Sequence, residues 1–170
     1  MDAMPLEHIG QFLKLMSQAR DERKTVFLAG NGGSASTASH MANDLLKTIA
    51  KTGGKGIKAL CLSDNIPVFT AIANDESYDR VFSSQLEVLA GPGDILLLIS
   101  GSGNSKNLLE AATTAKKLGL KMIGFLGMNG GSLKPLVDIS IIVPSDDYGP
   151  IEDMHMILNH LLTAYLRDHP

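Results

Sequence analysis

Five short apolar runs recur along the chain and predict five buried β-strands. The runs are hydrophobic almost throughout rather than alternating with polar residues, which is typical of strands that are covered on both faces of a sheet. They lie at residues 25–29, 57–62, 95–99, 121–126 and 139–143.

Amphipathic segments separate these runs. Apolar residues at three- and four-residue spacing predict a helix over about residues 4–20, and similar patterns lie at 34–49, 79–89, 105–118 and about 151–166. Pro150 marks the predicted start of the last helix. Strands that alternate with helices predict an α/β fold, in which a parallel sheet carries helices on both faces.

Length and composition narrow the class of protein. The 170 residues suit one domain and no linker divides them, so we expect a single domain over residues 1–170. The net charge of -3, with dispersed Lys and Arg, gives no sign of nucleic-acid binding. The apolar runs are too short to span a membrane, the first 20 residues do not resemble a signal peptide, and there is one cysteine. We therefore expect a soluble cytoplasmic protein.

Two glycine-rich loops follow the first and third predicted strands. Residues 30–35 are Gly-Asn-Gly-Gly-Ser-Ala, and residues 99–105 are Ile-Ser-Gly-Ser-Gly-Asn-Ser. Each loop leads into a predicted helix, whose first N–H groups favour an anion, and glycine lets the backbone approach it. The hydroxyls of Ser100, Ser102 and Ser105 add donors that suit a phosphate monoester. The alternative is a pair of ordinary turns with capping serines.

The first loop also matches a dinucleotide-binding pattern at Gly30, Gly32 and Ala35. That pattern calls for an acidic residue about 20 positions further on, but residues 51–55 contain none, and Asp64 would require an unusually long unit. The second loop lacks the lysine of a nucleotide triphosphate-binding loop. A nucleotide is therefore the weaker interpretation of both loops.

Ionisable residues are grouped on two of the predicted helices. His40 and Asp44 are four residues apart on one helix face, so they can form a proton-transfer pair, ligate a metal ion or simply hydrogen-bond at the surface. Glu152 and His160 are candidates on the last helix. About 12 Å of helix rise separates those two, so they do not easily hold one ion unless Glu152 lies at a frayed helix end or the two meet partners in different subunits.

The two loops together resemble the signature loops of the sugar isomerase (SIS) domain family. His40, followed four residues later by an acidic residue and much later by His160, further resembles the phosphoheptose isomerases. The resemblance covers about residues 25–166. It implies a three-layer, flavodoxin-like, doubly wound sheet of five parallel strands. It also implies a homotetramer with active sites at subunit interfaces, where the helices at about 4–20 and 151–166 would pack.

The resemblance further implies a reaction. Similar enzymes convert D-sedoheptulose 7-phosphate to D-glycero-D-manno-heptose 7-phosphate through an enediol, towards the heptoses of lipopolysaccharide, capsule or other surface polysaccharides. A carboxylate and a histidine move the proton, often around a zinc ion. Carried over to this chain, the catalytic residues are Asp44, His160 and Glu152, and the metal ligands are His40, Asp44, Glu152 and His160. The implied substrate-binding residues are Asn31, Gly32, Ser34, Asp75, Ser100, Gly101, Ser102 and Ser105.

Three positions depart from the family pattern. The phosphoheptose isomerases carry Glu at the position of Asp44, tend to have Gln at that of Glu152, and often have Thr at that of Gly101. A catalytic group misplaced by about 1 Å can lose 10²-fold in rate, so either Glu152 compensates as base or ligand, or catalysis is lost. The alternative function is a non-catalytic SIS module that senses a sugar phosphate or binds a partner protein, as one relative associates with a bacterial replication initiator.

Overall fold

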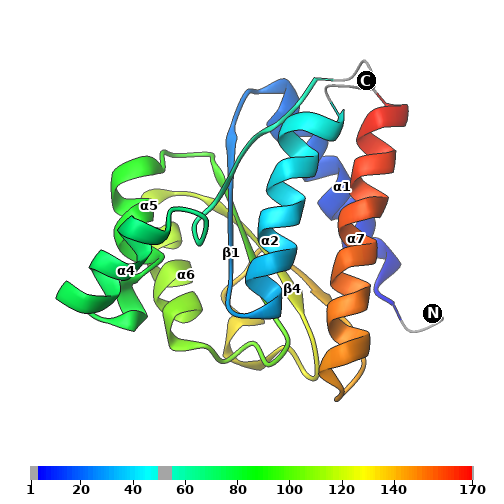
Figure 1. Ribbon diagram of the computed structural model, residues 1–170. Helices are drawn as coiled ribbons and strands as arrows, with labels where there is room; N and C mark the ends of the chain where they lie inside the picture. The colour runs from blue at the N-terminus through cyan, green and yellow to red at the C-terminus, as the bar shows by residue number, and fades with distance from the viewer. Residues whose placement is uncertain (1–3, 50–54, 170) are drawn as a thin grey trace.

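Five parallel strands form one sheet in the order β2-β1-β3-β4-β5 in the computed structural model, which describes residues 4–49 and 55–169 (Figure 1). The chain runs outward from β1 to β2 and then crosses back to β3 on the other side of β1. This order confirms the predicted flavodoxin-like, doubly wound sheet. The strands are β1 (Thr25–Gly30), β2 (Lys58–Cys61), β3 (Ile95–Ser100), β4 (Lys121–Leu126) and β5 (Ile139–Ile142).

Helices cover both faces of this sheet, as predicted. One face carries α1, α2 and α7, and the other carries α4, α5 and α6, with a separate apolar core under each layer (Figure 1). No helix among residues 4–49 and 55–169 is long and apolar enough to cross a membrane. The helices are α1 (Leu6–Asp21), α2 (Gly33–Asn43), α4 (Ile66–Asp75), α5 (Ser83–Leu89), α6 (Lys106–Leu118) and α7 (Tyr148–Asp168).

The two edge strands differ from the predicted pattern of continuous burial. β3 is buried along its whole length, whereas β2 and β5 alternate between buried and more exposed residues. In β2, for example, Ala59 and Cys61 are buried while Lys58 and Leu60 are exposed. A strand at the edge of the sheet has one face beyond the cover of the helices, so its apolar residues do not all face a core.

The helix predicted over residues 79–89 is shorter, and a further helix precedes it. Residues 78–80 form a single 3₁₀ turn, η2, before α5 begins at Ser83. The helix that the analysis missed, α4, has clear start signals: Asn65 caps it by accepting a hydrogen bond from the Val68 N–H, and Pro67 lies in its first turn. None of the residues of α4 is fully buried, although Phe69, Ile72 and Ala73 pack against the core, and its short apolar run over residues 66–73 does not by itself distinguish a helix from a strand.

The two helices that carry ionisable residues also have unexpected ends. α2 stops at Asn43 and continues directly as a π-helical turn, η1 (Asp44–Thr48), within the single helix predicted over 34–49. α7 starts at Tyr148, two residues before Pro150, which marks the predicted start. Asp147 caps α7 by accepting from the Gly149 N–H, and Pro150 fits in the first turn because no hydrogen bond is needed from its nitrogen there.

A buried arginine joins α7 to α1. Arg20 is 4% exposed, and its Nη1 donates to the carbonyls of Leu166 and His169, at 3.3 Å and 2.6 Å. A cation at the carboxyl end of a helix is favourable because it meets the negative end of the helix dipole. The far end of α7 is thereby fixed, while its first half lies beside α2 (Figure 1).

His155 faces the core from the middle of α7. Its ring is fully buried and lies against Phe125 of β4, with ring centroids 5.9 Å apart. Burial disfavours the charged imidazolium and lowers the pKa of His155 to about 4. The side chain is therefore a neutral core residue at pH 7.

This burial makes the stability of the fold sensitive to acid. The unfolded chain binds a proton at His155 near pH 6.5, whereas the folded chain does so only near pH 4, so stability is lost as the pH falls through that range. Methionine is apolar and of similar size and does not titrate. We therefore expect His155→Met to lose about 3 kcal/mol less of its free energy of unfolding between pH 7 and pH 4 than the wild type. Urea unfolding of both proteins at pH 7 and pH 4 measures the difference. If the stability difference between the two proteins does not change with pH, His155 is not the group that makes folding sensitive to acid. The control is His169→Ala, which removes an exposed histidine.

Candidate active site

A cavity of about 210 Å³ opens where the loops after β1 and β3 meet. These strands are neighbours, with Gly30 paired to Ile99, and the strand order reverses between them. A doubly wound sheet binds its ligands at this kind of crevice. The lining combines both predicted loops with the start of α7: Asn31, Ser34, Ile99, Ser100, Gly101, Ser102, Ser105, Leu108, Tyr148 and Glu152.

The three serines of the second loop have different roles. The Ser100 hydroxyl accepts a hydrogen bond from the Gly103 N–H at 3.0 Å, which holds the loop in shape. The Ser102 hydroxyl accepts from the Asn104 N–H at a longer 3.3 Å. Ser105 is the residue that caps α6, but its side chain makes no capping hydrogen bond. Its hydroxyl, together with the amino end of α6, is therefore available to an anion in the cavity.

The glycines of this loop are required by close packing. A Cβ on Gly103 would come against the Gly130 carbonyl, and its φ of +66° is one that favours glycine. A Cβ on Gly101 would lie 2.6 Å from Cε1 of Tyr148. A side chain at this position would therefore meet the Tyr148 ring, which lines the same cavity.

Asn31 of the first loop is held by two residues that the sequence analysis did not single out. Its Nδ2 donates to Oδ1 of Asn107 at 3.0 Å, and Nδ2 of Asn107 donates back to Oδ1 of Asn31 at 2.9 Å. The Tyr78 hydroxyl donates to the same Asn31 oxygen at 2.9 Å. Asn107 is a polar residue on the buried face of α6, and that position on an apolar stripe is a signal that could have identified it.

Glu152 lies at the amino end of α2. A Cβ on Gly33, the first residue of α2, would lie 2.6 Å from Oε1 of Glu152. A carboxylate is favourable at this end of a helix, where the dipole is positive. Glu152 therefore lies against the first loop and forms part of the cavity wall.

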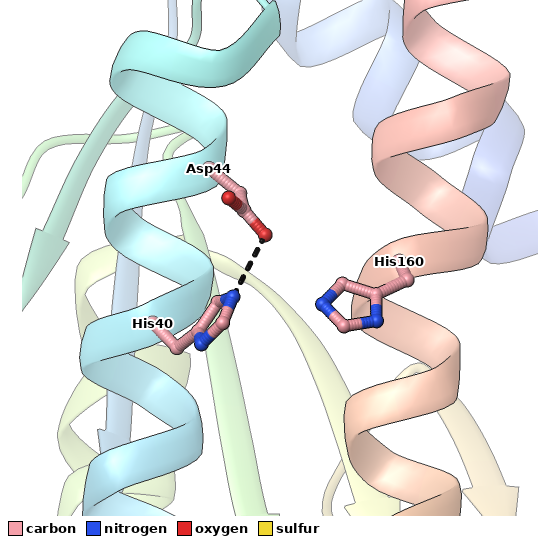
Figure 2. Close-up of side chains that lie close together, drawn as sticks. All are labelled: His40, Asp44 and His160. Carbon is pink, nitrogen blue, oxygen red and sulfur yellow. Dashed lines mark ion pairs between the residues drawn. The ribbon is translucent and has the colours of Figure 1, made fainter.

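A cluster of three ionisable side chains lies further along α2 and α7. His40 at the end of α2 and Asp44 at the start of η1 face His160 on α7 (Figure 2). Nε2 of His40 is 3.3 Å from Oδ2 of Asp44, and the rings of His40 and His160 are 5.4 Å apart at an angle of 62°. Asp44 is 7% exposed, while both histidines are exposed.

This cluster has the chemistry and spacing of a metal site. One ligand atom from each of His40, Asp44 and His160 lies within 4.8 Å of the others. Two imidazoles and a carboxylate form a ligand set that suits zinc, and three protein ligands with one open position are typical of catalytic zinc sites. The exposed side of both histidines leaves such a position facing solvent.

Three residues named from sequence are not where the prediction requires them: Glu152 is not in this cluster, and Asp75 and Gly32 do not line the cavity. Glu152 lines the serine cavity, about 12 Å of helix rise from His160, so the structure does not bring it to the other three within one chain. Asp75 is exposed at the end of α4, where its Oδ1 accepts from the side chain of Asn74, and it does not line the cavity. Gly32 precedes α2 with a φ of +55° and is exposed.

Comparisons with known proteins identify the family. The SIS domain model matches residues 3–127. A phosphoheptose isomerase of Helicobacter pylori (strain P12) is 42% identical over 163 residues, which are 96% of this chain and 84% of that protein. The phosphoheptose isomerase structure from Francisella tularensis superposes with a TM-score of 0.92 at 31% identity, over 98% of this chain and 87% of that one.

A second solved structure supports the same assignment. The phosphoheptose isomerase of Neisseria gonorrhoeae superposes with a TM-score of 0.87 at 32% identity, over 95% of this chain and 86% of that one. The matches extend beyond the SIS domain model and include α7, which carries Glu152 and His160. The chain therefore belongs to the SIS domain family and, within that family, to the phosphoheptose isomerases.

Proposed function

We propose that the protein isomerises D-sedoheptulose 7-phosphate to D-glycero-D-manno-heptose 7-phosphate by moving a proton between C1 and C2 through an enediol. The observation that carries this proposal is the convergence of His40, Asp44 and His160 on the same two helices whose amino ends line the serine cavity. A phosphate site and a proton-transfer site on one pair of helices suit a phosphorylated sugar. The relatives named above give no support to the non-catalytic alternative.

The serine cavity binds the phosphate of the substrate. Ser105 and Ser102 donate hydroxyl hydrogen bonds, the amino end of α6 supplies N–H groups, and Ser100 keeps the loop in shape. Asn31, held by Asn107, contacts the sugar hydroxyls on the other side. These contacts orient the sugar chain towards the middle turns of α2 and α7.

Proton transfer falls to Asp44 and His160. Asp44 takes the proton from the carbon beside the carbonyl and returns it to the neighbouring carbon, while His160 exchanges a proton with the sugar oxygens. His40, Asp44 and His160 would also hold a zinc ion, because a carboxylate has lone pairs for both a ligand bond and a proton. When bound, zinc supplies positive charge that polarises the carbonyl and stabilises the enediolate.

We also propose that the protein is a homotetramer. Leu6 of α1 is 77% exposed, and Ile157 and Leu161 of α7 are 47% and 42% exposed, one turn apart on a helix beside the site. Apolar side chains this exposed are well suited to a subunit interface formed by the first and last helices. We further propose that the enzyme acts in the cytoplasm and supplies heptose for surface polysaccharides such as lipopolysaccharide or capsule.

Removing a hydroxyl from the proposed phosphate site should weaken substrate binding without slowing the isomerisation step. Ser105→Ala should raise the KM for sedoheptulose 7-phosphate roughly tenfold or more, because a hydrogen bond to a charged group is lost, and should leave kcat nearly unchanged. Steady-state kinetics measure both constants. Thr113→Ala, which removes a hydroxyl from the exposed side of the same helix, is the matched control. A wild-type KM in Ser105→Ala would contradict this phosphate site.

The isomerisation itself is tested by direct turnover. We expect the zinc-loaded protein to convert sedoheptulose 7-phosphate to the aldose, as followed by NMR, and Asp44→Ala and His160→Ala each to lower kcat by about 10²-fold or more. His8→Ala is the control, because His8 hydrogen-bonds the Ser140 carbonyl at another edge of the fold. The proposal fails if the wild type gives no aldose, or if both active-site variants retain full activity.

A further inference from the structure

The Asp44 carboxylate is held on both of its oxygens. The Thr48 hydroxyl donates to Oδ1 at 3.0 Å, and Nδ2 of Asn159 donates to Oδ2 at 2.9 Å. Oδ2 is also the atom that lies 3.3 Å from Nε2 of His40. A carboxylate with both oxygens hydrogen-bonded inside a buried site has little freedom to rotate away from its partners.

Asn159 reaches Asp44 from α7, the helix that also supplies His160. The two residues are consecutive, so they point about 100° apart around the helix: His160 towards the solvent side of the cluster and Asn159 inward. Asn159 is fully buried, and its contact with Asp44 joins segments 115 residues apart in the chain. One turn of α7 therefore supplies one histidine of the cluster and fixes the carboxylate of the other helix.

The side-chain amide of Asn159 is oriented so that its NH2 group, and not its oxygen, makes the hydrogen bond to Asp44. Nδ2 donates to Asp44 and also faces Sδ of Met156 at 3.8 Å, whereas Oδ1 is buried without a hydrogen-bond partner among the described residues. A buried acceptor without a partner is unfavourable for stability, so a residue kept only for packing would be better replaced by leucine. Turning the amide over would set its oxygen against the carboxylate. The contact with Asp44 is what the asparagine supplies.

The second donor, Thr48, lies in the same locally distorted turn as Asp44. Asp44 and Thr48 are the first and last residues of the π-helical turn η1. In this wider turn the Leu45 carbonyl accepts from the Ile57 N–H, just before β2. Distortions of this kind are frequent at functional sites. Here the turn brings the Thr48 hydroxyl to Oδ1 on the side opposite Asn159.

We propose that Asn159 is a positioning residue that, with Thr48, fixes the short Asp44 carboxylate so that Oδ2 faces His40 and His160. The inference rests on the proposed function, because it assigns Asn159 to the same site. It also gives a physical reason why aspartate can serve where family members carry glutamate. The amide of Asn159 lies where a longer side chain would extend, and it holds the shorter carboxylate at a fixed place.

The main variant is Asn159→Leu, which keeps the volume and removes the donor. We expect its affinity for zinc alone, measured by competition with a chromophoric chelator, to fall 10–100-fold, as is typical when a group that orients a ligand is lost. For sedoheptulose 7-phosphate, kcat should fall by a similar factor with KM within about threefold, because the phosphate contacts are unchanged. In a crystal structure, the distance from Asp44 Oδ2 to His40 Nε2 should lengthen from 3.3 Å.

Thr163→Val is the matched control. Thr163 lies one turn further along α7, and its hydroxyl donates to the backbone carbonyl of Asn159, so the variant should leave zinc affinity, kcat and the position of the Asp44 carboxylate unchanged. If Asn159→Leu does not fold, Asn159→Ala takes its place, since it leaves space for water beside Asp44. The melting temperature of each variant separates a loss of folding from a loss of positioning.

A double-mutant cycle tests whether the two residues act as a unit. Asp44→Glu alone should bind zinc weakly because its longer side chain meets Asn159, and adding Asn159→Ala should restore affinity beyond the sum of the two single effects. Additive effects would overturn the inference. So would a folded Asn159→Leu protein with wild-type zinc affinity and an unmoved carboxylate. A wild type that binds zinc but gives no aldose would overturn the proposed function alone, because these readouts need no substrate.

Discussion

The packing of α2 against α7 determines the site. Both helices follow strands of a parallel sheet, run in the same direction over one face, and share the apolar core beneath them (Figure 1). Met41 and Leu45 from one side and Leu158 and Leu162 from the other are fully or almost fully buried there. Because the helices are parallel, their amino ends meet at the serine cavity, and the junction of α2 with η1 meets the middle of α7 at the His40 cluster. One packing contact therefore sets both the phosphate end and the reacting end of the site.

Local sequence signals predicted the parts of the site that lie close together in the chain. The two glycine loops and the spacing of His40 and Asp44 are short patterns whose chemistry follows from loop and helix geometry. The approach of His160 is different, because it depends on how α7 packs on a helix more than a hundred residues away. No local pattern contains that information, and only the family resemblance supplied it.

The same distinction explains what the sequence analysis missed. The start of α4 was readable from Asn65 and Pro67, but the short, nearly continuous apolar run over residues 66–73 does not by itself distinguish a helix from a strand. The contact of Tyr148 with Gly101 and the place of Glu152 beside Gly33 arise from the packing of the α7 amino end, which shows no local pattern. The order of the strands was easier to predict, because alternating strands and helices are compatible with few topologies of a parallel sheet.

The buried face of α7 carries polar side chains that are less favourable for the stability of the fold than apolar ones. His155 is neutral and lies against Phe125. One turn further on, Asn159 faces Asp44, and its side-chain Oδ1 has no hydrogen-bond partner among the described residues. Apolar residues at such positions are often as stable or more so. Polar groups that weaken the core are expected where they orient functional side chains, and Asn159 lies next to His160.

The central claim is that α2 and α7 together form one metal and proton-transfer centre. Anomalous diffraction at the zinc edge, from crystals of the zinc-loaded protein, tests it most directly. We expect one strong peak between the helices, within about 2.0–2.2 Å of a nitrogen of His40, a nitrogen of His160 and an oxygen of Asp44. A peak at Glu152 in the serine cavity, or zinc bound away from these three residues, would contradict it.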